Sequence, residues 1–396
     1  MNEIFPILIS AFLAFAATCW IRPYILRVAK KKSIVDNPDA RKLQRVPVPV
    51  LGGLTVVFGI VSGLMTFSLF GDMGVLFPVM AAIIIILIVG IIDDMISLSP
   101  KVRFLVEIML VLYLIFSTGC QLDNFHGLWG LQVIPSYIAI PLTLFASVGI
   151  INAINLIDGV DGYSSGYSIV SCILFGVMFY TLDNLSLVAF AVIIAASLLS
   201  FFFHNVFGKR SKMYIGDAGT LSLGIIFSVF VMFTLSPTHC TVTNLPSNFG
   251  FVPFVLAVLS IPVFDTLRVM SVRIKRGKSP FSPDKTHLHH LFIELGYSHI
   301  GTTLSIIFIN LLVVLCWYLA YRLGASIDVQ LYIVVAFGIF VTFIFYPFIK
   351  AQIRRESKIY LFLNKIAKLT HVERKGFWLT LQNLLDKSRD MDSSEL

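Results

Sequence analysis

Residues 75–92 read VLFPVMAAIIIILIVGII, and Asp93 and Asp94 follow directly. A helix needs about 20 mostly apolar residues to cross the hydrocarbon core of a bilayer. The stretch has none of the alternation between polar and apolar residues that is typical of a membrane β-strand. It therefore predicts a membrane-spanning helix with two carboxylates at its end.

Similar apolar stretches recur along the chain. Of the 396 residues, 57% are hydrophobic and only 13% are charged, whereas soluble domains carry about 25% charged residues. We predict an all-α, polytopic integral membrane protein with about 11 transmembrane helices, because only helices and closed barrels satisfy their backbone in lipid. The predicted spans are residues 3–22, 50–70, 75–92, 102–118, 133–151, 163–181, 185–203, 219–236, 250–267, 301–321 and 329–349.

The distribution of Lys and Arg predicts the orientation in the membrane. Cytoplasmic loops of membrane proteins carry an excess of these residues. An external N-terminus puts 29 of the 30 Lys and Arg residues on the cytoplasmic side and only Arg322 outside. We therefore expect an external N-terminus and a cytoplasmic C-terminus. This topology explains the excess of basic residues behind the net charge of +8, so we expect no nucleic-acid partner.

Asp, Asn and His residues collect at the predicted cytoplasmic ends of the spans. Besides Asp93 and Asp94, the motifs are Asn152-Ala-Ile-Asn155-Leu-Ile-Asp158-Gly-Val-Asp161, Gly216-Asp217-Ala-Gly219 and His287-Leu-His289-His290. Ionisable groups beside membrane spans are costly and by default mark function. Since four separate segments converge on one membrane face, we predict an active site there.

Each motif alone also has a purely structural explanation. The Asp93–Asp94 pair would suit a solvated helix end, Asp161 could cap the following helix, and Gly216–Gly219 could be a tight turn. Capped helix ends do not explain Asn155 and Asp158, whose spacing places them on one helical face. Structural roles therefore do not account for the whole set.

The residue types favour phosphoryl transfer assisted by a hard cation. Asp and Asn oxygens suit Mg²⁺ better than Zn²⁺, and His side chains can hydrogen-bond phosphate or a nucleobase. The chain has no G-x-x-x-x-G-K-[ST] loop, which argues against ATP as the donor. We therefore predict a Mg²⁺-dependent phosphoryl-transfer site.

The order of these motifs resembles the polyprenyl-phosphate N-acetylhexosamine-1-phosphate transferase family. The matching segments are Asp36–Gly53, Asp93–Asp94, Asn152–Asp161, Gly216–Gly224 and Asp284–His290. One departure is Gln44, because family members usually have His at this position, two residues after the Arg-Lys pair. The peptidoglycan-precursor member has three consecutive His residues, so the His-Leu-His-His motif favours the N-acetylhexosamine branch.

The resemblance implies transfer of an N-acetylhexosamine-1-phosphate, with GlcNAc-1-phosphate as the first candidate, from a UDP-sugar to undecaprenyl phosphate. The products would be UMP and an undecaprenyl-diphospho-sugar, at the start of an O-antigen, common antigen, teichoic acid or capsule. The reaction would occur on the cytoplasmic leaflet of the inner membrane, among membrane lipids. Mg²⁺, or Mn²⁺ in its place, would be the cofactor, and the family resemblance allows a homodimer.

The resemblance also implies a role for each motif residue. Asp93 would remove or hold off the proton of the lipid phosphate with support from Asp94, and Asp158 and Asp161 would position nucleotide or phosphates. The implied catalytic residues are Asp93, Asp94, Asp158 and Asp161; the substrate-binding residues are Arg41, Lys42, Asn152, Arg273, His287, His289 and His290; the metal ligands are Asp217 and Asn155.

Accordingly, we expect residues 1–349 to form a transmembrane catalytic domain with cytoplasmic active-site loops, whose motifs lie within residues 36–296. Residues 350–396 would form a basic cytoplasmic tail, in which basic and apolar residues alternate. That pattern fits an amphipathic helix on the anionic inner leaflet and equally a solvated helical tail.

Two other functions are compatible with parts of the pattern. A phospho-MurNAc-pentapeptide transferase of peptidoglycan synthesis would use similar carboxylates, but the spacing of the His residues disfavours it. A transporter of an anionic solute would usually carry its site near the bilayer midplane, between repeats. Here the acidic residues gather at one membrane face and no internal repeat is evident.

Overall fold

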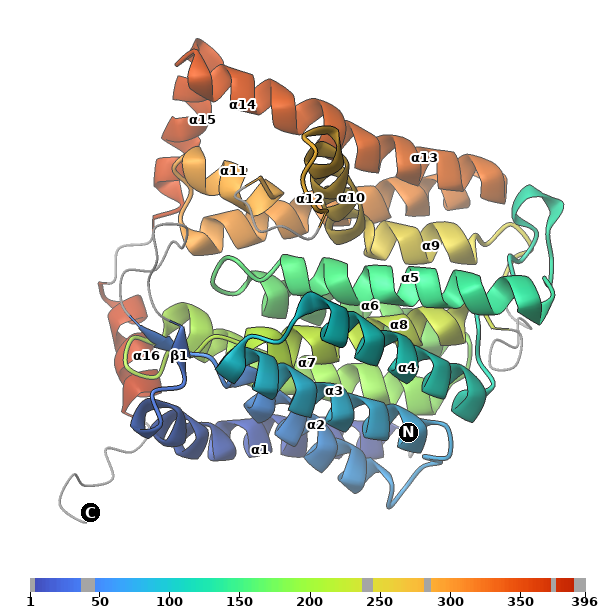
Figure 1. The fold of residues 1–396 in the computed structure, drawn as a ribbon, viewed down its shortest axis with the longest axis horizontal. Helices are drawn as coiled ribbons and strands as arrows, with labels where there is room; N and C mark the ends of the chain where they lie inside the picture. Colours follow the sequence, from blue (N-terminus) through green and yellow to red (C-terminus); the bar gives the residue numbers. More distant parts are fainter. Residues whose placement is uncertain (1–3, 37–46, 237–244, 281–285, 372–374, 388–396) are drawn as a thin grey trace.

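The structure is a computed structural model that describes residues 4–36, 47–236, 245–280, 286–371 and 375–387. Long helices pack side by side with their axes roughly aligned (Figure 1). The only sheet within these residues is an antiparallel pair of two-residue strands, β1 (Val35–Asp36) and β2 (Val48–Pro49). The prediction of an all-α polytopic membrane protein is confirmed.

Each predicted span contains helix. The long helices are α1 (Ile4–Lys31), α2 (Gly52–Phe67), α3 (Leu76–Ile96), α4 (Pro100–Thr118), α5 (Ser136–Leu156), α6 (Tyr163–Thr181), α7 (Leu185–Phe207), α8 (Gly216–Thr234), α9 (Phe251–Val258), α10 (Ser260–Lys275), α12 (His299–Arg322) and α13 (Ile327–Ile339). A π-helical segment, η2 (Phe340–Phe345), joins α13 to α14 (Tyr346–Arg354) without a break. The shorter elements are η1 (Leu128–Gly130), α11 (Leu288–Glu294), α15 (Lys358–Leu369) and α16 (Phe377–Asp386).

Length and composition qualify fewer helices as spans than the sequence predicted. In the part of the chain that the structure describes, eight helices are long and apolar enough, or nine if α9 and α10 form one span despite their 71° bend. Of the other predicted spans, α2 is apolar but has only 16 residues, and α4 carries Lys101, Arg103 and Glu107. The count of about 11 spans therefore stays a prediction.

Helix α8 lies at the centre of the bundle, between α3 and α5, and its residues 218–234 are all buried. Without a strong hydrophobic force between helices in lipid, close approach of backbones at small residues favours association. Gly53 in α2 and Gly90 in α3 provide that approach, because a Cβ on either would collide with the backbone of Ala218 or Gly219. Two helices are thus held directly against the first turn of α8.

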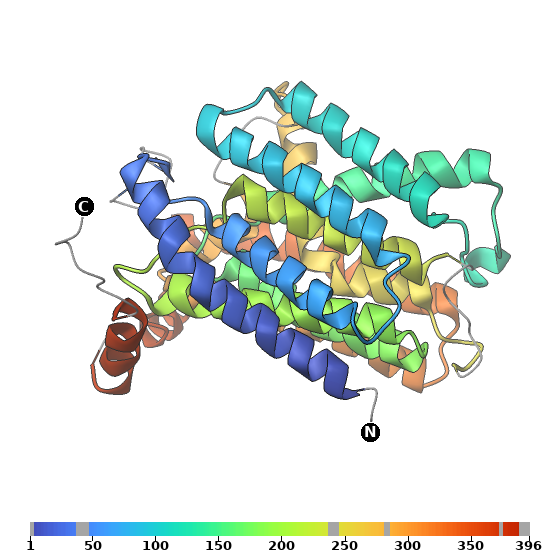
Figure 2. The ribbon, with the colours of Figure 1, turned by 90° about the horizontal axis from the view of Figure 1, so that it is seen from below.

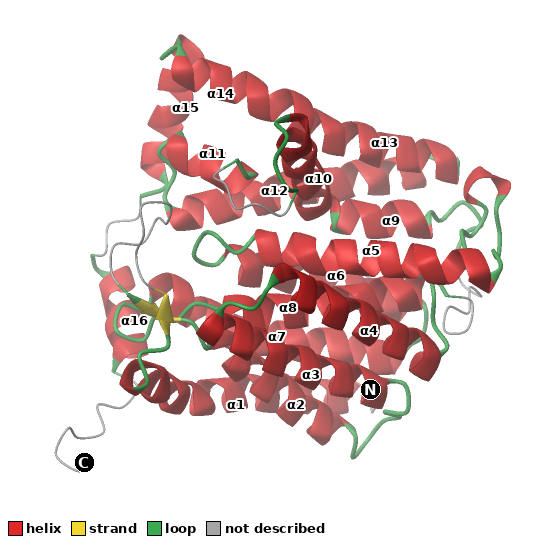
Figure 3. Cartoon of the chain, viewed as in Figure 1, coloured by secondary structure: helices red, strands yellow, loops and turns green. Residues whose placement is uncertain are grey.

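The remaining helices enclose this centre and place its first turn at one end of the bundle. Helix α1 packs along α2 and α7 on the outside (Figure 2). Loops lie at both ends of the bundle, and the small sheet and α16 share the same end (Figure 3). The segment just before α8 is bound to the start of α2, since Gly52 and Gly53 donate to the carbonyls of Tyr214 and Ile215. This end of the bundle contains the candidate site.

Candidate active site

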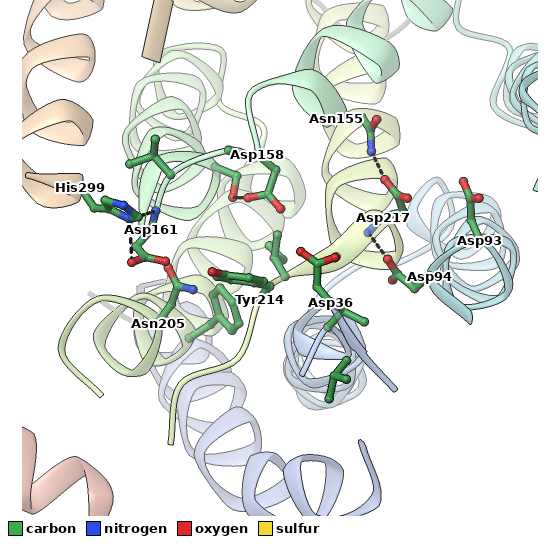
Figure 4. Close-up of a pocket in the computed structure, with 18 of the residues that line it drawn as sticks. Asp36, Asp93, Asp94, Asn155, Asp158, Asp161, Asn205, Tyr214, Asp217 and His299 are labelled. Atoms are coloured by element: carbon green, nitrogen blue, oxygen red, sulfur yellow. Dashed lines mark hydrogen bonds and ion pairs between the residues drawn. The ribbon is translucent and has the colours of Figure 1, made fainter. Parts of the chain in front are cut away.

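A cavity of about 440 Å³ opens at the end of the bundle that carries β1. Six carboxylates from separate parts of the chain line it, and Figure 4 shows them gathered around the first turn of α8. The polar lining residues are Asp36, Asp93, Asp94, Ser97, Asn155, Asp158, Asp161, Ser164, Asn205, Tyr214, Asp217, His290 and His299. The predicted convergence of the Asp motifs is therefore present in the structure.

Asp94 of α3 caps helix α8. Its carboxylate accepts hydrogen bonds from the backbone N–H groups of Asp217, at 2.8 Å, and Ala218, at 3.1 Å. The first turn of a helix has N–H groups without helical partners and a partial positive charge, so a carboxylate is favourable there. Asp94 thus fixes the backbone that carries Asp217, and it is not the solvated helix end of the alternative explanation.

Asn155 and Asp217, the predicted metal ligands, are in direct contact. The Asn155 amide donates to Oδ1 of Asp217 at 2.6 Å and to the hydroxyl of Thr220 at 2.8 Å. Among the described residues, no donor hydrogen-bonds to the other carboxylate oxygen of Asp217. Asn155 therefore orients Asp217 and leaves one of its oxygens available to the cavity.

Asp158 and Asp161 have different surroundings although they share one loop. Burial raises the pKa of Asp158 to about 7, and a 2.7 Å hydrogen bond from Ser164 offsets part of this effect. Burial would also raise the pKa of Asp161, but Lys212 at 2.6 Å and His299 at 2.8 Å hold it below its usual value. Asp161 is therefore an ionised carboxylate, whereas Asp158 can exchange a proton near neutral pH.

The suggestion that Asp161 caps the next helix is wrong. The residue at the start of α6 is Gly162, whose φ of 78° is left-handed, and no side chain caps this helix. The Gly162 N–H instead donates to the Asn205 side chain at 2.7 Å, and Asn205 also donates to the Met213 carbonyl at 2.9 Å. Asn205 thus ties the Asp161 loop to the segment before α8, which leaves Asp161 for its two basic partners.

Asp93 lies at the edge of the cavity and is only 8% exposed. It accepts a 2.7 Å hydrogen bond from the Leu98 N–H and a 3.4 Å contact from Arg103. Arg103 also lies 3.6 Å from Glu107, to which Asn152 donates at 2.7 Å. Asn152 is therefore part of the α4–α5 interface and does not line the cavity, contrary to its predicted contact with substrate.

The three His residues have separate environments. His290 lines the cavity, whereas His289 is buried beside Tyr163, and burial holds its pKa well below the usual value. His287 lies before α11, with its Nδ1 2.9 Å from a carboxylate oxygen of Asp265. Of the three, only His290 lines the cavity, and their contacts with substrate stay predictions.

Arg273 is not among the residues that line the cavity. Its side chain is buried and donates to the carbonyl of Pro280 at 2.5 Å, so it holds the loop that leads towards α11. Arg273 and His287 both contact other parts of the protein here, and their binding of substrate stays a prediction. Arg41 and Lys42 lie outside the described residues.

Several contributors to the cavity are not marked by the motifs used for the prediction. Asp36 appears only inside a longer matching segment, and Tyr214 and Lys212 precede Asp217 in an ordinary basic loop. His299 lies two residues before the predicted span 301–321, and it contacts Asp161 from 138 residues away along the chain. Of these residues, only Lys212 could have been found from the sequence, because it is a basic residue close to the acidic motif at Asp217.

Comparison with known proteins gives the family. Residues 76–235 match the model described as glycosyl transferase family 4. A Bacillus subtilis (strain 168) protein named "Probable undecaprenyl-phosphate N-acetylglucosaminyl 1-phosphate transferase" is 32% identical over 305 residues, which cover 77% of this chain and 82% of that protein. The chain belongs to glycosyl transferase family 4. The resemblance inferred from the motifs is thereby confirmed.

Other members of the family are similar over most of their length. The undecaprenyl-phosphate alpha-N-acetylglucosaminyl 1-phosphate transferase of Escherichia coli (strain K12) is 29% identical over 69% of this chain and 72% of its own. The decaprenyl-phosphate N-acetylglucosaminephosphotransferase of Mycolicibacterium smegmatis is 29% identical over 74% of this chain and 75% of its own. The segment that matches the family model contains every Asp of the cavity except Asp36, and it ends before His290 and His299.

The donor chemistry of this family 4 cavity fits Mg²⁺. Mg²⁺ is usually held by one or two carboxylates, with waters and substrate phosphates as its other ligands. Asp217 has one oxygen without a donor, and Oδ1 of Asp161 is buried without a hydrogen-bond partner in the described structure. No three acidic, His or Cys side chains of the described residues form a complete metal site. Substrate phosphates would therefore supply part of the coordination.

Helix α16 fixes the loop that precedes α8. The Asp386 carboxylate accepts hydrogen bonds from the backbone N–H groups of Lys209, Arg210 and Ser211 at 2.9–3.1 Å. Trp378 stacks on Phe207 of α7, with ring centroids 5.1 Å apart. Neither of the two alternatives for the tail, an amphipathic surface helix or a solvated helix, predicted this docking.

We expect Asp386→Ala to lower turnover several-fold, because the loop of residues 209–211 also carries Lys212 to Asp161. Charge-assisted bonds to backbone N–H groups stabilise a loop more than neutral ones do. Asp386→Asn is the matched control, since its Oδ1 can still accept at the position that all three N–H groups approach. Hydrogen exchange of amides 209–211 would report the loosening, and unchanged protection in Asp386→Ala would contradict the role.

Proposed function

We propose that this protein transfers GlcNAc-1-phosphate, or a related N-acetylhexosamine-1-phosphate, from a UDP-sugar to undecaprenyl phosphate. An oxygen of the lipid phosphate attacks the sugar-linked phosphorus, the bond to the UMP phosphate breaks, and an undecaprenyl-diphospho-sugar and UMP result. The observation that carries this proposal is the family 4 carboxylate cavity, with Asp217 held by Asn155 and Asp94 at the start of α8. The names of the relatives support the choice of acceptor and of the transferred group.

Two anionic substrates can meet in a cavity lined by six carboxylates only if their charge is neutralised. We propose Mg²⁺ as the cofactor, and its positive charge would stabilise the negative charge that develops on the phosphates. Asp217 is the residue placed to hold the ion, and Asn155 fixes the orientation of its carboxylate. Lys212 and His299 keep Asp161 ionised, so that its negative charge is available to the metal ion.

Asp158 is better placed than Asp93 to take up a proton from the lipid phosphate. A group that exchanges protons during catalysis works best with a pKa near the working pH, and burial raises the pKa of Asp158 to about 7. The Asp93 carboxylate, in contrast, is bound by Arg103 and by the Leu98 N–H. We therefore assign the proton to Asp158 and a positioning role at the α3–α4 turn to Asp93.

The cavity end of the bundle would face the cytoplasm of an inner membrane. Helix α12 supports this orientation, because it begins at His299 beside the cavity and ends at Arg322, the one basic residue predicted outside. Arg103 and Lys212 form ion pairs with Asp93 and Asp161 of the cavity. By the positive-inside rule, the carboxylates would then lie on the cytoplasmic side of the bilayer, where UDP-sugars are made.

The test is an assay of the purified protein with radiolabelled UDP-GlcNAc, undecaprenyl phosphate and Mg²⁺. We expect butanol-extractable label with an equal amount of UMP, and loss of both products when EDTA removes the metal. UDP-GalNAc and UDP-MurNAc-pentapeptide in parallel assays would define the donor. Lipid-linked label from the pentapeptide donor alone would favour the peptidoglycan alternative, and no label from any donor would reject the proposal.

A further inference from the structure

A second cavity, of about 430 Å³, lies between α10 and the continuous helix formed by α13, η2 and α14. It has no lining residue in common with the carboxylate cavity. Four of its lining side chains are cationic, and they are Arg268, Arg276, Lys350 and Arg354. We call it the basic cavity.

Arg268 is an unusual component of this cavity because it is only 4% exposed. Its guanidinium lies 3.7 Å from the centre of the Tyr346 ring, and it donates to Asp265 at 2.6 Å and to the carbonyl of Thr286. Its Nε is buried and has no hydrogen-bond partner in the described structure. A buried, charged donor without a partner is costly, so an acceptor entering the cavity would be favourable.

The charges of the basic cavity are not balanced. Arg268 is paired with Asp265, and Lys350 is paired with Glu294. No ion pair joins Arg276 or Arg354 to an acidic residue within the described parts of the chain. Counted over the described residues, the cavity therefore has an excess of two positive charges, which an anion can neutralise.

The other side of the cavity is apolar and continues onto the lipid-facing surface. Phe343, Tyr346 and Pro347 belong to its lining. On the same continuous helix, Phe340 and Ile344 are 51% and 56% exposed, and they belong to a segment apolar enough to span the membrane. A ligand here would place its anionic group among the basic side chains and an apolar chain along this helix.

We infer that the basic cavity binds the phosphate headgroup of an anionic glycerophospholipid from the surrounding membrane. Basic residues at the ends of spans are common and usually serve topology alone. These four differ because they converge on one cavity and one of them is buried with an unpartnered donor. Basic pockets between transmembrane helices are a known way to hold anionic headgroups.

The occupant is a resident lipid and not the polyprenyl-phosphate acceptor of the proposed function. The acceptor's phosphate must reach the carboxylate cavity to react, and no lining residue is shared between the two cavities. A link between them exists all the same. Arg268 is bound to Asp265, whose other partner His287 immediately precedes the helix that carries His290. A bound lipid would therefore stabilise the position of α11.

The test compares lipid binding to the purified full-length protein in detergent. Phosphatidylglycerol is expected to raise its melting temperature, whereas phosphatidylcholine and inorganic phosphate leave it unchanged. The double variant Arg276→Gln/Arg354→Gln should bind phosphatidylglycerol about tenfold more weakly or worse, since two cations are lost. The matched control, Arg355→Gln/Lys358→Gln, removes the same charge outside the cavity and should bind normally.

Three results would overturn the inference. Equal stabilisation by phosphatidylcholine would exclude headgroup recognition, and equal stabilisation by inorganic phosphate would identify a soluble anion instead. Displacement of phosphatidylglycerol by undecaprenyl phosphate would assign the cavity to the acceptor. The variant Arg276→Lys/Arg354→Lys should retain binding, which separates loss of charge from loss of folding. Because binding is measured without turnover, the result stands even if the proposed transferase activity is not found.

Discussion

Asp217→Asn is expected to lower turnover by about 10³-fold while the protein remains folded. The substitution keeps the shape of the side chain, and its Oδ1 can still accept the 2.6 Å hydrogen bond from Asn155. The backbone N–H groups that Asp94 binds are also unchanged. What disappears is the negative charge that we propose holds Mg²⁺.

The measurement is turnover over a range of Mg²⁺ concentrations, with the thermal melting curve recorded for each variant. We expect Asp217→Asn to require more Mg²⁺ at its residual rate and to melt as the wild type does. Asp72→Asn is the control, since Asp72 is a carboxylate in the α2–α3 loop that lies outside the cavity lining. A wild-type rate with unchanged Mg²⁺ dependence would remove Asp217 from the metal site.

The fold was predictable because lipid imposes a simple rule on a chain. Every predicted span contains helix, since a long apolar stretch in a bilayer has to satisfy its own backbone. The bend between α9 and α10 was not predicted, although Pro262 lies in the first turn after it. A proline can bend a helix or simply lie in its first turn. Which of the two occurs depends on the helices packed around it, and the hydropathy of the sequence does not reveal those contacts.

The carboxylates of the site were predictable for a related reason. Asp93, Asp94, Asp158, Asp161 and Asp217 are charges at the ends of apolar stretches, where they are costly unless they serve a purpose. Their individual partners were not predictable. Asp94 accepts a hydrogen bond from Asp217, 123 residues after it in the chain, and no local pattern specifies a contact across such a distance.

Asn152 and Asn155 show the limit of periodicity as a guide to the site. They lie on one helical face, and the motif gives no reason to separate them. Both residues lie in α5. Asn155 donates a hydrogen bond to Asp217 of α8, whereas Asn152, one turn earlier in the helix, donates to Glu107 of α4. Two equivalent positions on a helix thus acquire different roles because they face different neighbours.

The second large effect is expected from Gly53→Ala, which adds one methyl group to α2. A Cβ at this position would collide with the backbone nitrogen and Cα of Gly219, and backbone atoms cannot rotate away as a side chain can. Helix α2 or the first turn of α8 must shift, and this turn carries Asp217. Because misplacement of a catalytic group by about 1 Å can cost about 10²-fold in rate, we expect a loss of that order.

Gly149→Ala in α5 is the matched control, because a Cβ there would meet no atom within 4 Å. It should retain wild-type turnover and gain slightly in stability, since Ala has a higher helix propensity than Gly. Gly53→Ala should in addition destabilise the protein by about 1–3 kcal/mol, the usual cost of overpacking. Equal turnover and equal melting temperatures for the two variants would show that α8 is not held by this contact. Gly90→Ala, which overlaps the Ala218 backbone from α3, should reproduce the defect from the other side of the same turn.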